Sequence, residues 1–151
     1  MQITRATDYA VRALTHLAML PPATRLTAEE LAGENHVSSA RAAKILQRLV
    51  AARLLVSRRG FDGGFELARA PREVSILDIV TALEGPLCLN VCLAGGAGCG
   101  DSASCTARSV WARAQTALER ELAGATLEQL AARPGDRESV PLMAAACQVP
   151  A

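Results

Sequence analysis

The chain has 151 residues, of which half are hydrophobic but only 3% are aromatic, and its formal net charge is +1. This length suits one domain, or a small domain with an appended helix, and a core built from Ala, Leu and Val favours packed helices. No apolar run approaches the roughly 18 residues of a membrane span, and the N-terminus does not have the pattern of a signal peptide. We therefore expect a cytoplasmic protein with no membrane partner, whose cysteines stay reduced.

The charge is divided unequally along the chain. Residues 1–72 carry eleven Lys or Arg and six Asp or Glu, whereas residues 73–151 carry five and nine. A basic half followed by an acidic half is typical of a polyanion-binding module joined to a different unit. The alternative is chance clustering of charges on solvated faces.

Helical periodicity dominates the first fifty residues. Apolar residues recur at helical spacing from about Thr4 to Leu20, where two prolines follow. Thr27 and Glu30 have the spacing of a capping box that opens a short second helix. A third helix is expected to begin at Ser38 or Ser39, and we expect its inward residues to be Ala43, Leu46, Leu49 and Val50. Two short helices with so tight a link predict a helix-turn-helix.

A β-hairpin is predicted directly after the third helix. Two short apolar stretches, 54–57 and 65–68, flank a turn that contains Gly60, Gly63 and Gly64. A hairpin that follows a helix-turn-helix is a winged-helix arrangement. The predicted fold class is therefore mainly α, a winged helix-turn-helix with a two-stranded β wing.

The second half of the chain predicts a different organisation. A fourth helix ends near Glu84, a loop rich in Gly and Cys follows over 85–105, and a long helix runs from about Ser104 to Leu122. Thr126 and Gln129 form a capping box for a short last helix. We divide the chain into a DNA-binding winged helix-turn-helix (1–72), a unit with the cysteine loop and the long helix (73–132) and a flexible tail (133–151).

A nucleic-acid surface is predicted around the third helix and the hairpin. No acidic residue lies between Val37 and Phe61, while six Lys or Arg do. DNA is a line of phosphates, and a recognition helix enters the major groove with its N-terminal residues nearest the bases. The expected partner is double-stranded DNA. The candidate contact residues are Ser38, Ser39, Arg41, Lys44, Arg58, Arg59, Gly63 and Gly64.

Four of the five cysteines fall within eighteen residues with the spacing C-x3-C-x6-C-x5-C, at Cys88, Cys92, Cys99 and Cys105. In a reducing compartment this run favours a metal or a cluster over disulfides. The gaps are wider than those of paired zinc knuckles and contain glycines, which favours an iron–sulfur cluster. A zinc site and metal-free redox thiols are the alternatives. The chain has no CxxC motif and no catalytic acid–base constellation, so we do not expect an enzyme.

Together these features resemble the Rrf-two type iron–sulfur winged-helix transcriptional regulators, the IscR/NsrR family. The resemblance covers about residues 1–132. It is carried by the opening helix 1–14, by the wing element Arg59–Phe65, by the segment Ile79–Gly85 and by three cysteines. The family implies a homodimer formed through the long helix and promoter binding that depends on the state of a cluster.

The resemblance also implies a ligand set. In the family three cysteines hold the cluster, and by position these are Cys92, Cys99 and Cys105. The IscR branch adds a histidine shortly after the last cysteine, and 106–109 contains none. The NsrR branch uses an aspartate of the first helix from the other subunit, where Asp8 stands. The chain is therefore closer to the NsrR branch, with Cys88 as a rival fourth ligand.

The function implied is a transcription regulator whose cluster senses nitric oxide, redox state or iron–sulfur supply. Three cysteines and one oxygen ligand favour a 4Fe–4S cluster, with 2Fe–2S as the alternative. A zinc-stabilised DNA-binding protein and a thiol-redox regulator without a cluster are the competing functions.

Overall fold

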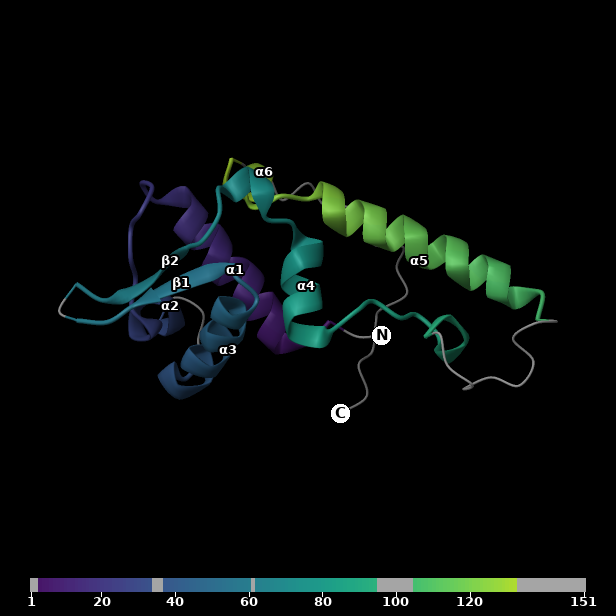
Figure 1. The fold of residues 1–151 in the computed structure, drawn as a ribbon, viewed down its shortest axis with the longest axis horizontal. Helices are drawn as coiled ribbons and strands as arrows, with labels where there is room; N and C mark the ends of the chain where they lie inside the picture. The colour runs from purple at the N-terminus through teal and green to yellow at the C-terminus, as the bar shows by residue number, and fades with distance from the viewer. Residues whose placement is uncertain (1–2, 34–36, 61, 95–104, 133–151) are drawn as a thin grey trace.

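The computed structural model describes residues 3–33, 37–60, 62–94 and 105–132. The first helix, α1 (Arg5–Met19), lies at the centre of the fold (Figure 1). Thr4 is its N-cap, with the side-chain oxygen accepting a hydrogen bond from the Thr7 backbone N–H. One face of α1 is buried because its apolar residues recur every three or four positions. These residues are Tyr9, Ala10, Ala13, Leu14 and Leu17.

The predicted helix-turn-helix is formed by α2 (Ala28–Gly33) and α3 (Ser39–Ala51). The capping box before α2 is present, since the Thr27 N–H donates to Glu30 Oε2 at 2.7 Å and the Glu30 N–H donates to Thr27 Oγ1 at 3.2 Å. The buried face of α3 differs from the expected one. Ala42 and Ile45 are buried beside Leu46 and Leu49, while Ala43 and Val50 are half-exposed. The expected and the observed inward faces of α3 are both apolar, so the sequence pattern does not distinguish them. Packing against α1 and α4 decides which face is buried.

The wing consists of β1 (Leu55–Arg58) and β2 (Gly64–Leu67), which pair antiparallel. Leu26, in the segment before α2, extends this pairing: the Phe65 N–H donates to the Leu26 carbonyl at 2.8 Å, and the Leu26 N–H donates back at 3.2 Å. The side chain of Phe65 is buried in the core. The hairpin is therefore held against the helical body at its base, and its tip extends beyond that body (Figure 1).

The core continues beyond residue 72. After the 3-10 turn η1 (Pro71–Glu73), α4 (Ile76–Glu84) packs on α1 and α3, and the last helix, α6 (Leu127–Ala131), packs on α1. Ser75 and Thr126 open α4 and α6 with capping boxes. Two backbone hydrogen bonds, Ile76 N–H to Ala125 O and Leu127 N–H to Val74 O, both 2.9 Å, join these segments. Apolar side chains of α4 and α6 thus share one cluster with α1–α3.

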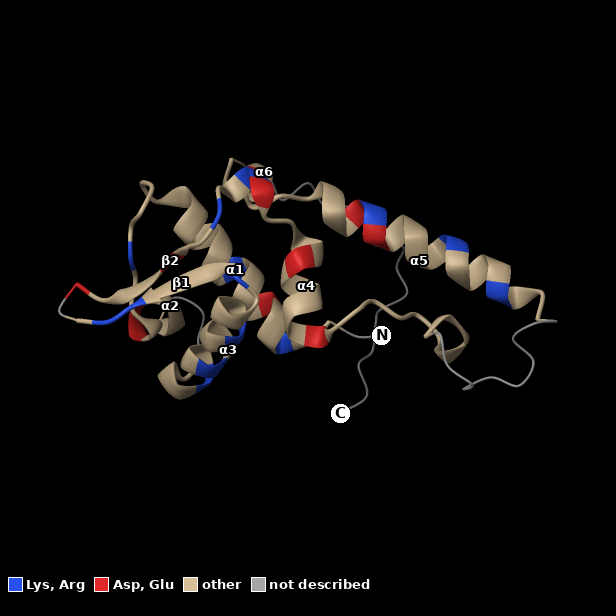
Figure 2. Ribbon diagram, in the orientation of Figure 1, with Lys and Arg blue, Asp and Glu red and all other residues tan. Residues whose placement is uncertain are grey.

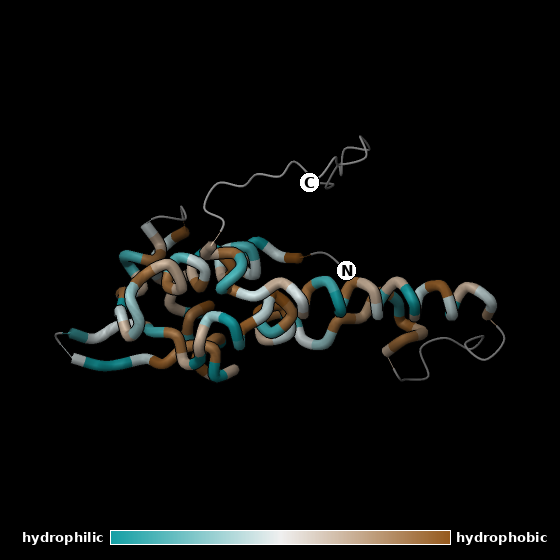
Figure 3. Tube along the Cα trace, turned by 90° about the horizontal axis from the view of Figure 1, so that it is seen from above, coloured by the Kyte–Doolittle hydropathy of each residue, from teal (hydrophilic) through white to brown (hydrophobic). Residues whose placement is uncertain are grey.

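The long helix, α5 (Ala107–Gly124), extends away from the rest of the fold, with the segment that carries the 3-10 turn η2 (Val91–Leu93) beside it (Figures 1 and 3). None of its residues is buried. Leu118 and Leu122 are partly covered, whereas Val110 and Trp111 are 51% and 43% exposed. An apolar stripe is thus left uncovered at the outer end of α5. No helix among the described residues is long and apolar enough to cross a bilayer.

Gly64 provides a test of the wing. Its φ is +151°, and a Cβ at this position would lie 2.8 Å from the Leu26 carbonyl oxygen. We expect Gly64→Ala to lower the free energy of unfolding by about 1–3 kcal/mol, because backbone strain and a backbone clash combine. Urea denaturation followed by circular dichroism measures the change.

Gly124→Ala is the matched control, since this glycine ends α5 and has no neighbour within 4 Å of an added Cβ. It should be neutral or should stabilise by up to about 1 kcal/mol, as alanine does in helices. Equal stability of the two variants would contradict the packing of the wing on Leu26.

Candidate nucleic-acid interface and cysteine segment

The start of α3 presents an exposed polar and basic face. All four residues predicted to contact DNA there, Ser38, Ser39, Arg41 and Lys44, are exposed. Ser38 is the N-cap of α3 but makes no side-chain capping hydrogen bond; its carbonyl oxygen accepts from the Arg41 and Ala42 N–H groups at 3.0 and 2.9 Å. Within the described part of the chain, Arg41 and Lys44 form no ion pair. Figure 2 shows this run of Lys and Arg on α3 without an acidic residue.

The two wing arginines differ in their surroundings. Arg58 Nε lies 3.4 Å from Glu66 Oε1, while the other carboxylate oxygen of Glu66 accepts from Arg25 Nε at 2.8 Å. The hydrogen bond from Arg25 is the main reason that the pKa of Glu66 lies below its usual range. Arg58 and Arg25 therefore share the carboxylate of Glu66 as their acidic partner. Arg59 is exposed and, across the described ranges, has no such partner.

The two candidate wing glycines are needed by the hairpin itself. A Cβ on Gly63 would lie 2.7 Å from the carbonyl oxygens of Arg58 and Gly60, and one on Gly64 would meet Leu26. The turn and the packing of the wing thus account for both glycines. A role in approaching DNA remains a hypothesis for these two positions.

A junction of three helices lies behind the basic face. We define the α4 junction as Leu83 and Glu84 at the end of α4 with Arg48 of α3 and Thr4 and Thr7 at the start of α1. The Arg48 guanidinium donates to the Leu83 carbonyl, and both threonine hydroxyls donate to Glu84 Oε1, that of Thr4 at 2.6 Å. These hydroxyls, Thr4 first, hold the pKa of Glu84 below its usual range. No local pattern around Arg48 in the sequence indicates this contact with Leu83, 35 positions away.

The described cysteines lie on the segment between α4 and α5. Cys88 is half-buried, and its thiol donates to the Asn90 carbonyl at 3.0 Å. It lines a cavity of about 660 Å³ with residues of α4 and α5. Cys92 is half-buried on η2, and Cys105 is exposed just before α5. Cys99 lies outside the described residues.

Two hydrogen bonds tie this segment to α5. The Leu89 N–H donates to Gln115 Oε1 at 3.2 Å, and Arg108 Nε donates to the Cys92 carbonyl at 3.4 Å. Arg108 is three residues after Cys105, so the second bond links the two described ends of the cysteine loop. The 3-10 turn η2, which contains Cys92, is thus hydrogen-bonded to α5, the helix that follows Cys105.

The predicted ligands are not assembled in the part of one chain that the structure describes. No group of three or more His, Cys, Asp or Glu is arranged there to hold a metal ion. Asp8 lies on the exposed side of α1 and forms an ion pair with Arg12 at 3.2 Å. The assignment of Asp8 as a ligand in another subunit therefore stays a prediction.

The family model described as "Rrf2: Iron-dependent Transcriptional regulator" matches residues 3–133. The chain belongs to the Rrf2 family. This membership confirms the resemblance noted above, and the matched family and relatives are described as transcriptional regulators rather than enzymes.

Several relatives of this Rrf2 protein are informative. A Mycobacterium tuberculosis protein named as an HTH-type transcriptional regulator is 37% identical over 87 residues, which are 58% of this chain and 54% of that protein. The match thus spans about half of that relative's length. The solved structure of CymR, the global cysteine regulator of B. subtilis, has 26% identity and a TM-score of 0.72 over 87% of this chain and 97% of that chain. T. potens IscR has 25% identity and a TM-score of 0.68 over 86% and 85%. These likenesses confirm the winged-helix fold.

The α4 junction of this Rrf2 protein generates a prediction on pH. Because the folded pKa of Glu84 is lowered, its stabilisation is fully present above the unfolded pKa of about 4.3 and is lost as the pH falls through the folded pKa. Glu84→Gln removes the charge but keeps an acceptor oxygen. Because Glu84 is exposed and its charge is screened by solvent, we expect the variant to lower the free energy of unfolding at pH 7 by only about 0.5 kcal/mol, and this difference should shrink as the pH falls below about 4.3.

Urea denaturation of the wild type and the variant across this pH range measures the difference. Glu121→Gln, an exposed carboxylate of α5 for which the described residues provide no hydrogen bond, is the control. A pH-independent difference for Glu84→Gln would argue against a charge-assisted junction.

Proposed function

We propose that the chain binds double-stranded DNA and regulates transcription. The observation that carries this proposal is the exposed face of α3, where Ser38, Ser39, Arg41 and Lys44 stand without an acidic neighbour on the helix. A helix of this kind fits a major groove, and basic side chains gain affinity by releasing counterions from phosphates. Arg59 in the wing adds a second cationic point beside α3, suited to a narrow minor groove.

We infer that an iron–sulfur cluster controls this binding. Thiolates are preferred ligands of such clusters, and the family model is that of iron-dependent regulators. We assign Cys92, Cys99 and Cys105 as ligands, with Asp8 of the partner subunit as the fourth, as in the NsrR branch. Arg108 supports this assignment because its bond to the Cys92 carbonyl keeps that cysteine near the helix that follows Cys105. When bound, the cluster would supply a group that reacts with nitric oxide or oxidants. The cytoplasm, which is reducing, is the location that suits it.

Cys88 is better explained as a structural cysteine than as a ligand. Its thiol already donates to the Asn90 carbonyl, and it lines the cavity between α4 and α5. A thiol-redox regulator without a cluster is the second candidate function. The likeness to CymR, a cysteine regulator, favours this candidate as much as the likeness to IscR favours the first.

We further propose that the active form is a homodimer joined through α5. Val110 and Trp111 are large apolar side chains exposed on a helix that has no buried residue. Covering them with the same helix of a second copy would remove apolar area from water. Such a dimer also brings two α3 helices together, as two half-sites on a duplex require.

The DNA face is tested by Lys44→Gln and Arg59→Gln. We expect each variant to bind a labelled duplex of random sequence about tenfold more weakly at 100 mM KCl, because each loses a charge-assisted contact. Arg72→Gln is the matched control, as this exposed arginine of η1 pairs only weakly with Glu73, at 3.9 Å. Fluorescence anisotropy measures the affinities. If all three variants bind like the wild type, α3 and the wing are not the DNA surface.

The cluster is tested by iron and sulfide analysis of protein purified without oxygen. Cys105→Ser should lose iron, sulfide and the visible absorption of the cluster, because a ligand is removed. Cys88→Ser should retain all three. Wild-type protein that contains neither iron nor sulfide would reject the cluster and favour the thiol-redox regulator, and zinc in their place would favour the zinc alternative.

A further inference from the structure

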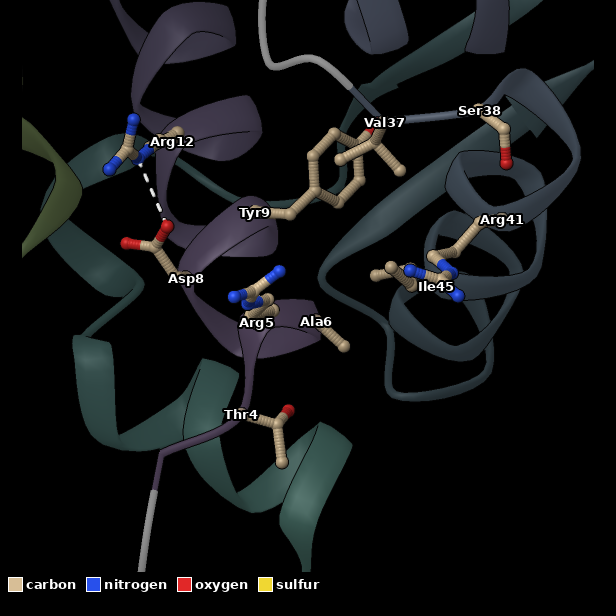
Figure 4. Close-up of a pocket in the computed structure, with 10 residues that line it drawn as sticks. All are labelled: Thr4, Arg5, Ala6, Asp8, Tyr9, Arg12, Val37, Ser38, Arg41 and Ile45. Atoms are coloured by element: carbon tan, nitrogen blue, oxygen red, sulfur yellow. Dashed lines mark ion pairs between the residues drawn. The ribbon is translucent and has the colours of Figure 1, made fainter. Parts of the chain in front are cut away.

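A pocket of about 720 Å³ lies between the first turns of α1 and α3 (Figure 4). Arg5 lines it from α1, and Ser38 and Arg41 line it from the start of α3. Behind them Tyr9 and Ile45 are buried, with 2% and 5% of their surface exposed. The pocket therefore has basic and hydroxyl groups at its mouth. The wall behind them is formed by Ile45 and the ring of Tyr9, whose buried hydroxyl has no hydrogen-bond partner among the described residues.

The side chains that line this pocket carry an excess of positive charge. Asp8 also lines it, but its carboxylate is paired with Arg12 at 3.2 Å, and Figure 4 shows this pair together on the side of α1 away from α3. Arg5 and Arg41 reach into the space between the two helices. Neither has an acidic partner among the residues that the structure describes. Both guanidinium groups line the same pocket, so an anion placed in it would be attracted by both.

The polar groups of the pocket are donors suited to an oxyanion. Arginine presents a planar fork of N–H groups that matches phosphate or carboxylate oxygens. Ser38 adds a hydroxyl that is not used to cap α3. The first N–H groups of α3 have no acceptor within the helix, and the helix dipole is positive at this end. Burial raises the pKa of Tyr9, so its phenol stays neutral and adds no negative charge.

We propose that this pocket binds a phosphate group, and that its occupant in the functional complex is a backbone phosphate of the DNA duplex. The inference rests on the proposed function, because it places α3 in a major groove. The walls of that groove are the two phosphate strands, about 12 Å apart. A cationic pocket directly beside the N-terminus of α3 then meets one wall. Such a contact fixes the register of the helix without reading sequence.

The arrangement of the elements supports a duplex rather than a small anion as the occupant. In Figure 1 the wing tip and the start of α1 lie on opposite sides of α3. A duplex that meets Arg59 of the wing and Lys44 of α3 would extend past the pocket mouth. Arg41 belongs both to the pocket and to the exposed face of α3, so the two surfaces are continuous.

Arg5 tests the inference because it lines the pocket and lies outside the predicted DNA-contacting set. Binding of the full-length protein to a labelled random duplex is measured between 50 and 200 mM KCl. We expect Arg5→Gln to bind about tenfold more weakly, and to reduce the slope of log affinity against log salt by about one per bound subunit. Arg5→Lys should keep most of the slope, and Arg72→Gln on η1 should match the wild type. The loss should be equal on duplexes of different sequence.

The possible results separate the two proposals. If Lys44→Gln weakens binding and Arg5→Gln leaves affinity and slope unchanged, the phosphate pocket is wrong and the DNA-binding function stands. If neither variant changes binding, the proposed function itself fails. Unfolding midpoints that match the wild type show that a variant is folded.

A second measurement identifies the source of the phosphate. The unfolding midpoint is compared in inorganic phosphate and in KCl of equal ionic strength. If phosphate raises the midpoint of the wild type but not of Arg5→Gln, while duplex binding is unaffected by the substitution, the pocket takes a free anion and the duplex assignment is overturned. A reduced salt slope for Arg5→Gln supports the duplex assignment.

Discussion

The α4 junction determines how the other parts of the molecule can act on one another. The Leu83 carbonyl near the end of α4 accepts from Arg48 in the last turn of α3, and Glu84 accepts from two hydroxyls at the start of α1. Three helices are thus tied at one point by polar contacts, while their apolar faces share one core. Because Arg48 is on the same helix as the residues proposed to contact DNA, its bond to Leu83 fixes the orientation of α3 relative to α4.

The sequence predicts local features well. The capping boxes that start α2 and α6 are formed by residues three positions apart, and the sequence pattern predicts both; the structure adds caps with the same spacing at the starts of α1 and α4. The wing could be predicted because glycine marks a tight turn, and the structure shows the atoms that exclude a side chain there. The exposed basic face of α3 followed from the absence of acidic residues over 37–61. These predictions depend on neighbours in the chain, and tertiary packing changes them little.

Contacts between distant residues could not be predicted in this way. Arg25 and Glu66 are 41 positions apart, Arg48 and Leu83 are 35 apart, and Thr4 and Glu84 are 80 apart. Nothing in the composition of these segments indicates the pairing. The inward face of α3 is an intermediate case, because two apolar stripes compete and only contacts with α1 and α4 decide that Ala42 and Ile45 are buried. The pocket at Arg5 also depends on such packing.

The position of the cysteine segment limits how a signal there could reach the DNA face. Gly85 ends α4 with a φ of +85°, and Leu87, two residues later, is buried, so the segment starts from a fixed point. Its later part is tied to α5 through Gln115 and Arg108, and α5 itself has no buried residue. A change at the cysteines therefore moves α5 more easily than it moves α3, which the α4 junction holds. In the proposed dimer, where α5 joins the two copies, such a movement changes the distance between the two winged-helix units while each stays folded. Changing the distance between the two units thus requires less energy than unfolding either of them, because no contact in the hydrophobic core has to break.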